Sequence, residues 1–486
     1  MTYQTLKQKS ISGLLWSFID NFAIQGIRFV VGIVLARILS PREFGLIAMI
    51  TIFIAISKSV INSGFSGALI RKEKCTLEDY STVFYYNLVT GIIFFILLFL
   101  TAPAISNFFN EPILKLIVQI ISLVLIIDSF TIIQRTILIK RLDFKLQAKI
   151  SVIASIGSGG IAIIFALLDY GIWSLVALQL SQGIINSCLL WLWNGWKPVW
   201  VFSQNSFWEL FGFGSKLMIS GLIATIYNNV YYIVIGKYYS TMELGYYTRA
   251  EQFSNLPSQN LNSVIGRVSF PLLSSMQGDI PLLRASFQKL LRSTMYITFV
   301  LMLGLAAVAE PMILSLVGEK WLNSVIYLQM LCFVGMFYPL HALNLTLLNV
   351  MGRSDLFLKL EVIKRTLAIP AIVLGVFFGI KIMIAGMLVN NLIAFYLNSY
   401  WTGKMIKYSK KQQLSDILPS FILSLLMGAG VYGLGLLLPF SLLVNLFIQI
   451  LTGALLIITI SEIKNFRDYE YIKTVIFENV ISLNKI

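Results

Sequence analysis

Six basic side chains lie within stretches that are otherwise apolar and long enough to cross a lipid bilayer: Arg28, Lys58, Arg135, Lys216, Arg249 and Arg267. A charge held at membrane depth is costly, so such residues usually mark a path for a ligand or an ion. All six carry positive charge. They therefore predict binding positions for an anion that passes through a membrane.

Three acidic residues share these stretches, namely Asp20, Asp128 and Glu251. Buried charges are usually paired whatever their purpose, so Asp20 could meet Arg28 or Lys58. Six bases facing three acids still leave an excess of positive charge that an anion could neutralise. We expect the acids to orient the bases or to take part in ion coupling.

Helical periodicity gathers the polar residues of these stretches on single faces. At 100° per residue, Asp20, Asn21, Gln25 and Arg28 fall within about 140° of arc. A later face, about 100° wide by the same rule, runs from Arg249 to Arg267, which would stand roughly 27 Å apart along a helix. Such side chains need one another or water, so we expect them inside a helix bundle. The predicted polar lining is Asn21, Gln25, Asn62, Gln259, Asn260 and Ser263.

Composition sets the class to which the helices belong. Of 486 residues 57% are hydrophobic and only 12% are charged, which excludes an ordinary soluble surface. We predict an all-α polytopic membrane protein with about 14 transmembrane helices. The first apolar run is full length and leads directly into another, so we expect a retained helix rather than a cleaved signal peptide. The expected spans are 12–39, 43–69, 80–102, 112–138, 146–168, 171–194, 208–236, 243–273, 287–309, 322–350, 357–379, 382–401, 416–438 and 441–461.

The loop charges predict the orientation. Most of the 37 Lys and Arg fall in loops on the same side as the N-terminus, and the positive-inside rule then places both termini in the cytoplasm. The formal charge of +15 is spread over many short loops rather than clustered on a folded domain, which argues against nucleic acid as a partner.

Other chemistries lack their signatures in the sequence. The cysteines Cys75, Cys188 and Cys332 have no metal-binding spacing. No P-loop, zinc-protease motif or nucleophile elbow is present. We expect no catalytic residues, no metal and no cofactor.

Comparison of the chain with itself indicates an internal repeat. The segment from Val34 to Gly45 aligns with the segment from Val234 to Gly245 at an offset of 200 residues, and matches near Thr136 and Thr346 continue at an offset of 210. Six helices per copy make the repeat parallel. Transporters built this way carry their ligand between the two halves. We predict six-helix lobes at 1–200 and 201–409 and an additional helix pair with a cytoplasmic tail at 410–486.

Several segments resemble one family of bacterial membrane proteins: VLARILSPREFGLIAM (34–49), RKEKCTLEDYSTVFYYN (71–87), RLDFKLQAKISVIAS (141–155), DYGIWSLVALQL (169–180), LGYYTRAEQFSNLP (244–257) and VSFPLLSSMQGD (268–279). The chain resembles the polysaccharide flippases of the multidrug/oligosaccharidyl-lipid/polysaccharide exporter superfamily, especially the O-antigen, colanic acid and teichuronic acid repeat-unit exporters. The likeness covers nearly the whole chain. None of its motifs specifies a sugar.

The resemblance implies two six-helix lobes in a V around a cationic cavity that opens alternately to each side of the bacterial cytoplasmic membrane. It implies an oligosaccharide repeat unit on undecaprenyl pyrophosphate as the substrate, flipped to the outer leaflet for cell-surface polysaccharide such as lipopolysaccharide. Polysaccharide polymerase machinery is a candidate partner, and we expect a monomer. On this interpretation the six basic residues contact the pyrophosphate or acidic sugars.

Three other functions remain open from the residues alone, of which a purely structural membrane protein is the weakest. A drug or cation antiporter of the same superfamily would prefer an acidic cavity, which disfavours it here. A membrane glycan polymerase or ligase would be expected to place polar catalytic residues in a substantial external loop. Every external loop predicted here is short.

Overall fold

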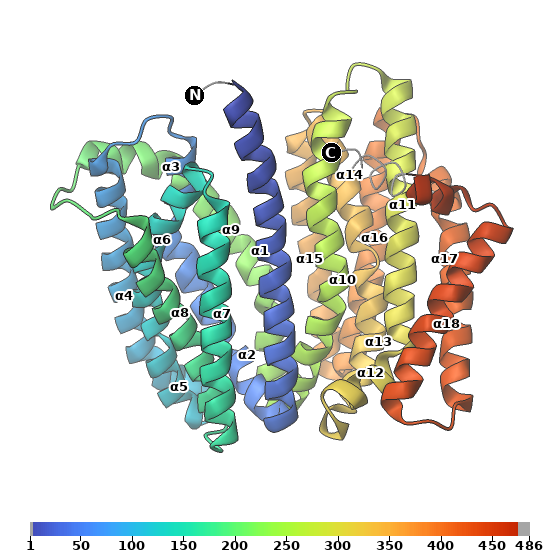
Figure 1. Ribbon diagram of the computed structural model, residues 1–486, viewed down its shortest axis with the longest axis horizontal. Coiled ribbons are helices and arrows are strands. Elements are labelled where there is room, and N and C mark those ends of the chain that lie inside the picture. The colour runs from blue at the N-terminus through green and yellow to red at the C-terminus, as the bar shows by residue number, and fades with distance from the viewer. Residues whose placement is uncertain (1–2, 475–486) are drawn as a thin grey trace. The chain divides into compact units, whose positions relative to one another are not determined.

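The protein is described over residues 3–474 by a computed structural model (Figure 1). All regular secondary structure in this range is helical, so the predicted all-α fold is confirmed. The helices form two compact units, of which the first ends at Gly245 and the second begins at Tyr246. The lobe boundaries predicted from the repeat, at residues 200 and 409, stay predictions.

The first unit contains nine helices within the described range and the start of a tenth. These are α1 (Tyr3–Ile38), α2 (Pro41–Asn62), α3 (Phe65–Arg71), α4 (Leu77–Phe109), α5 (Ile113–Ile121), α6 (Leu123–Lys140), α7 (Phe144–Leu167), α8 (Trp173–Asn194), α9 (Gln204–Tyr238) and the first turn of α10 (Thr241–Ser274). Helix α7 packs between α1 and α8, α6 packs on α4 and α8, and α9 packs on α2, α3 and α4 (Figure 1). An aromatic cluster around Phe65, Phe84 and Trp196 joins α3, α4 and α9.

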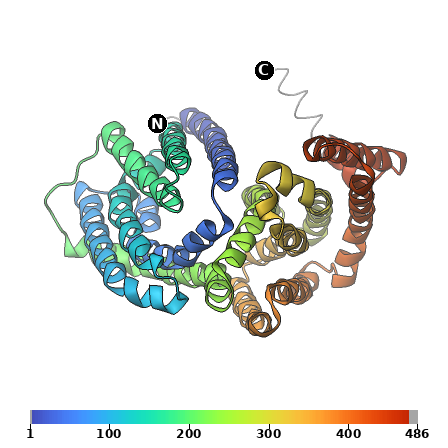
Figure 2. The ribbon, with the colours of Figure 1, turned by 90° about the horizontal axis from the view of Figure 1, so that it is seen from below.

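The second unit contains the rest of α10 and the remaining helices. These are α11 (Ile280–Ala307), α12 (Ala309–Leu316), a short 3₁₀ helix (Glu319–Trp321), α13 (Ser324–Gly335), α14 (Tyr338–Val350), α15 (Ser354–Phe378), α16 (Ile380–Met405), α17 (Lys410–Leu437) and α18 (Leu442–Ile463). Helix α17 packs on α11, where Met427 and Val431 enter an apolar cluster with Tyr296, and α18 packs on α17 and α12. Helices α17 and α18 lie at the periphery of this unit in Figure 2 (red).

Twelve membrane spans are supported by length and hydropathy among the described residues. They comprise α1 from Asp20, α2 with α3, α4, α5 with α6, α7, α8, α9, α11, α13 with α14, α16, α17 and α18. The two other expected spans coincide with α10 and α15, continuous helices of 34 and 25 residues. Charged residues such as Arg249 in α10 and Lys364 in α15 lower the hydropathy of these two helices. The count of fourteen therefore stays a prediction.

Helix boundaries support the internal repeat. Helices α1 and α9 end at Ile38 and Tyr238, and α2 and α10 begin at Pro41 and Thr241, each pair 200 residues apart. Ser40 forms a capping box with Glu43 at the start of α2, and the hydroxyl of Ser240 accepts from the amide of Glu243 at the start of α10. These caps satisfy backbone amides that a helix start leaves without partners.

The two copies of this helix start also contact each other inside the first unit. A Cβ atom on Gly45 would lie 1.8 Å from the carbonyl oxygen of Thr241, and one on Gly245 would lie 1.9 Å from the carbonyl oxygen of Pro41. Each glycine therefore packs against the backbone of the other copy. Only a residue without a side chain allows this approach.

The repeat continues at an offset of 210 in the turns that follow α6 and α14. Leu142 and Gly352 both adopt left-handed backbone conformations, with φ of 58° and 71°. The next amides, of Asp143 and Arg353, donate to the carbonyls of Leu138 and Leu348. The same turn thus leads into α7 and α15.

Candidate functional site

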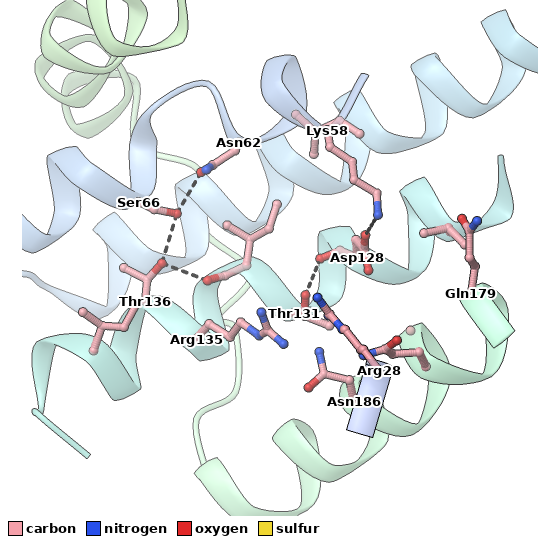
Figure 3. A pocket seen from close by; sticks show the side chains of 16 residues that line it. Arg28, Lys58, Asn62, Ser66, Asp128, Thr131, Arg135, Thr136, Gln179 and Asn186 are labelled. Carbon is pink, nitrogen blue, oxygen red and sulfur yellow. Dashed lines mark hydrogen bonds and ion pairs between the residues drawn. The ribbon is translucent and has the colours of Figure 1, made fainter. Parts of the chain in front are cut away.

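A cationic cavity of about 550 Å³ lies within the first unit (Figure 3). Five helices line it: α1, α2, α3, α6 and α8. Its polar lining residues are Arg28, Lys58, Asn62, Ser66, Asp128, Thr131, Arg135, Thr136, Gln179, Gln182 and Asn186. The volume is within the range of small-molecule sites, about 300–1,000 Å³.

Three cations from three helices converge on this cavity. Arg28 comes from α1, Lys58 from α2 and Arg135 from α6, and all three side chains are accessible rather than packed away. Figure 3 shows their nitrogen-bearing ends in the same region of the pocket. A ligand in the cavity can therefore reach all three charges.

The cavity contains one lining carboxylate. The Lys58 ammonium lies 2.7 Å from Oδ2 of Asp128, and the two side chains are 43% and 28% exposed. The hydroxyl of Thr131 donates to the backbone carbonyl of Asp128, at 2.8 Å. Asp128 therefore orients Lys58, and this partly exposed pair can exchange partners with a bound anion.

Asp20 contributes a second negative charge behind the lining. This residue of α1 is only 8% exposed, and its carboxylate interacts electrostatically with Arg135 and Arg28. Three cations facing two carboxylates leave the region with net positive charge. An anionic ligand would remove that imbalance.

A chain of hydrogen bonds fixes one wall of the cavity. Ser66 donates to Oδ1 of Asn62 at 2.8 Å, and Thr136 donates to the hydroxyl of Ser66 at 3.1 Å (Figure 3). These bonds tie α2, α3 and α6 together. The opposite wall depends on Gly183 of α8, where a Cβ would lie 3.2 Å from Ile127, so a small residue allows α8 to approach α6 closely.

Five of the predicted site residues come together in the cavity: Arg28, Lys58, Asn62, Asp128 and Arg135. Asp20 lies next to it, whereas Asn21 and Gln25 are on the same helix but outside the lining. Lys216 is exposed on α9, also outside the lining.

The remaining predicted residues belong to the second unit. Glu251 and Gln259 lie on α10. The side chains of Asn260, Ser263 and Arg267, on the same helix, lie outside the described part of the structure. Their role in ligand binding stays a prediction.

Arg249 has a packed environment in the second unit. It is 3% exposed, its guanidinium lies 5.1 Å from the ring centroid of Trp321, and it donates to Oε1 of Gln252 at 2.7 Å. A guanidinium stacked on an indole ring gains from the negative face of the ring. This arrangement stabilises the fold locally, and a contact with substrate stays a prediction.

The sequence analysis missed the contribution of α8. Gln179, Gln182 and Asn186 line the cavity and provide amide donors and acceptors. Their spacing of three and four residues places them on one face of an apolar helix. That periodic set of amides within a membrane span was the available signal.

The cavity can hold an anion, and no metal site accompanies it in the described range. Two guanidinium groups offer parallel donors that match phosphate oxygens, and an ammonium adds a point charge. Among residues 3–474 no group of three or more His, Cys, Asp or Glu could hold a metal ion. The polar hydroxyl and amide groups around the cations suit a hydroxyl-rich ligand.

A helical membrane fold whose helix boundaries recur 200 residues apart, with a cationic cavity, defines a polytopic protein that can bind an anionic ligand. The chain belongs to the polysaccharide biosynthesis protein family, whose sequence profile matches residues 34–326. The resemblance to polysaccharide flippases is confirmed at the level of the family.

Three relatives illustrate the match. The chain is 29% identical over 438 residues to the teichuronic acid biosynthesis protein TuaB of Bacillus subtilis (strain 168), covering 89% of this chain and 90% of TuaB. It is 28% identical over 377 residues to the lipopolysaccharide biosynthesis protein WzxC of Escherichia coli (strain K12), covering 76% of each. It is 30% identical over 309 residues to the succinoglycan biosynthesis transport protein ExoT of Rhizobium meliloti (strain 1021). The match covers 63% of this chain and 62% of ExoT.

Two solved structures share the fold. The lipid II flippase MurJ in an inward closed conformation superposes with a TM-score of 0.76 at 18% identity, covering 94% of this chain and 99% of MurJ. An inward-facing multidrug resistance transporter of the MATE family superposes with a TM-score of 0.63 at 13% identity. This match covers 80% of this chain and 96% of the transporter. At these identities the likeness establishes the fold alone.

Proposed function

We infer that this chain is a flippase that moves lipid-linked oligosaccharide repeat units from the cytoplasmic to the outer leaflet for cell-surface polysaccharide synthesis. Membership of the polysaccharide biosynthesis family and the transport role named for ExoT support this function. The observation that carries it is the net positive cavity lined by membrane-spanning helices. The protein is a transporter rather than an enzyme.

The substrate expected for this family, undecaprenyl pyrophosphate bearing an oligosaccharide, matches the cavity in its chemistry. Its polyprenyl tail remains in lipid, whereas the pyrophosphate and sugars cannot cross hydrocarbon without help. Arg28 and Arg135 bind phosphate oxygens through paired donors, and Lys58 exchanges Asp128 for the ligand. Gln179, Gln182 and Asn186 hydrogen-bond to sugar hydroxyls.

Transport then follows alternating access. In transporters with internal repeats, one bundle rocks against the other around a fixed site. The cations lower the barrier for the headgroup because they replace part of its hydration. Lys216, Arg249 and Arg267 remain proposed contacts along the path, and Glu251 remains a proposed ion-coupling group.

The membrane orientation and assembly are part of the proposal. The excess of Lys and Arg in the loops on the N-terminal side supports cytoplasmic termini. We propose a monomer that delivers its substrate to polysaccharide polymerase machinery. Reporter fusions at both termini that are active only in the cytoplasm would test the orientation.

Charge removal in the cavity tests the function. In a strain lacking this protein, Arg28→Gln should fail to restore surface polysaccharide and should leave lipid-linked oligosaccharide on the inner leaflet. Arg28→Lys should restore part of the surface polysaccharide, because the lysine keeps a positive charge at this position. Lys197→Gln, an exposed residue of the same unit outside the cavity, serves as the charge-matched control.

Protein level in the membrane must be equal for all variants. Normal polymer display from Arg28→Gln would reject the assignment. Drug resistance on overexpression with no effect on surface glycan would instead favour an antiporter, the function suggested by the MATE-like fold.

A further inference from the structure

A second hollow lies entirely within the second unit, between α15 and α16. Its volume is about 440 Å³. It shares no residue with the cationic cavity. We call it the α15–α16 groove, and it is lined by Leu356, Lys359, Leu360, Ile363, Tyr396, Leu397, Tyr400 and Trp401.

The groove is apolar along its length and basic at one end. Lys359 is part of the lining, and Lys404 donates to the hydroxyl of Tyr400 at 2.6 Å. Lys410, at the start of α17, lies 3.6 Å from the ring centroid of Tyr396. Aromatic rings of the groove therefore hold two of the three lysines beside its basic end.

The positive charge of this end is not neutralised by nearby acids. Asp355 pairs with Arg353, and Glu361 pairs with Lys364 and Arg365. Within the described residues, no carboxylate forms an ion pair with Lys359, Lys404 or Lys410. The three lysines can therefore bind an external anion.

The apolar part of the groove continues onto an exposed hydrophobic surface. On α16, Val389 and Ile393 are 55% and 39% exposed and lie about two turns and one turn from Tyr396, respectively. On α15, Val362 is 56% exposed beside Ile363. On the prediction that α15 crosses the membrane beside α16, these residues face lipid, and an alkyl chain can follow this surface toward the middle of the bilayer.

We propose that the α15–α16 groove binds an anionic glycerophospholipid, with an acyl chain along its apolar floor and the phosphate on Lys359, Lys404 and Lys410. Charge complementarity selects this occupant, because a zwitterionic headgroup would bring its own cation toward three lysines. Basic pockets between transmembrane helices are known to take anionic headgroups. Tyrosine and tryptophan at the basic end suit the membrane interface.

The proposal does not depend on the identity of the transported substrate. The first turns of α15, near Lys359, carry several charges. The bound lipid would hold this helix against α16 in the bilayer. Loss of the lipid should therefore lower the thermal stability of the purified protein. The cationic cavity should stay intact, because it shares no residue with the groove.

Binding can be measured by native mass spectrometry of the full-length protein in detergent. Titration with phosphatidylglycerol should show one tight site, and phosphatidylethanolamine should bind at least tenfold more weakly. The triple variant Lys359→Gln, Lys404→Gln and Lys410→Gln should lose roughly a hundredfold in affinity for phosphatidylglycerol, on the basis of about fivefold per lysine. Ile363→Trp, which fills the groove without changing charge, should also weaken binding.

The matched control carries the same charge change elsewhere. Lys149, Lys197 and Lys464 are exposed and lie outside the groove, and their triple replacement by Gln should leave the tight site intact. Equal binding of the two phospholipids, or wild-type affinity in both the triple lysine variant and Ile363→Trp, would overturn the proposal. So would displacement of phosphatidylglycerol by equimolar undecaprenyl phosphate, which would assign the groove to the substrate.

Discussion

The two copies of the internal repeat share their helix boundaries, but their charges differ. The four charged lining residues of the cationic cavity, Arg28, Lys58, Asp128 and Arg135, correspond at offsets of 200 and 210 to Asn228, Ser258, Tyr338 and Leu345. Both copies keep the helix caps at Ser40 and Ser240. Local backbone requirements retain the helix starts in both copies, while the charged lining of this cavity comes from the first copy.

Two of the corresponding positions in the second copy, Ser258 and Leu345, contribute to packing. Ser258 is fully buried and donates to the carbonyl of Ser254, at 3.1 Å. Leu345 packs against the apolar cluster of Leu348, Leu356 and Leu360. A charged lining that one copy supplies and the other does not repeat suits a ligand with one anionic headgroup, whereas two equivalent linings would suit a symmetric ligand.

The largest expected effect is the loss of a cavity cation in the first copy. Arg135→Gln should reduce surface polysaccharide by between about tenfold and a hundredfold, because a charge-assisted hydrogen bond contributes about 1.5–3 kcal/mol. The measurement is surface glycan per cell at equal protein level in the membrane.

The corresponding position of the second copy provides the comparison. Leu345→Met should leave glycan display near the wild-type level, because the swap conserves volume in an apolar cluster. Equal losses from both variants would mean that position in the fold, rather than charge, decides the effect.

The next effect concerns the contact between the copies. Gly45→Ala and Gly245→Ala each force a Cβ into a backbone carbonyl, which should destabilise the protein by about 1–3 kcal/mol. Because the two glycines share one contact, the double variant should cost less than the sum of the single variants. Thermal unfolding in detergent measures these changes.

Gly160→Ala is the matched control, since a Cβ at this position of α7 would meet nothing within 4 Å. It should stabilise the helix slightly, by about 0.5–1 kcal/mol. If Gly45→Ala raised the unfolding temperature as Gly160→Ala should, Gly45 would not pack against the backbone of the other copy.

A smaller effect is expected for the acid of the cavity. Asp128→Asn removes the partner of Lys58 and increases the net positive charge, so glycan display should stay within about threefold of wild type, given the small contribution of a partly exposed pair. Lys58→Gln should reduce display by about tenfold. Equal losses from the two variants would assign a direct role to Asp128, such as ion coupling.

Much of the fold followed from sequence because its signals are local. Apolar length predicted the spans, and the offsets at Gly45/Gly245 and Thr136/Thr346 predicted the repeat that the helix ends now support. The polarity of single helix faces predicted that Arg28, Lys58 and Arg135 lie inside the bundle, and all three line one cavity. Membrane exclusion of polar groups makes such faces converge.

The rest required tertiary information. Periodicity places Lys216 and Arg249 on polar faces, but it cannot say which neighbour each face meets. Arg249 meets Trp321, which is distant in sequence. Amides carry no formal charge, so Gln179 and Asn186 of α8 produced a weaker signal than the arginines, although their spacing was informative.

The smallest expected effect compares the turns that follow α6 and α14. Leu142 holds a left-handed conformation that its counterpart Gly352 adopts without steric cost. A non-glycine residue there costs about 1–2 kcal/mol, so Leu142→Gly should relieve strain in the folded state. The greater entropy of glycine in the unfolded chain offsets about 0.5–1 kcal/mol of that gain.

The net result for Leu142→Gly should be a small rise in unfolding temperature, and Gly352→Leu should lower it by introducing the same strain in the other copy. Leu168→Gly is the control, because Leu168 directly follows α7 with an ordinary φ of −90° and is mostly exposed. Because Leu168 has no backbone strain to relieve, Leu168→Gly should only lower the unfolding temperature of the protein. A fall in stability for Leu142→Gly as large as that for Leu168→Gly would mean that the left-handed turn is unstrained, and that the leucine contributes more through contacts than it costs in backbone energy.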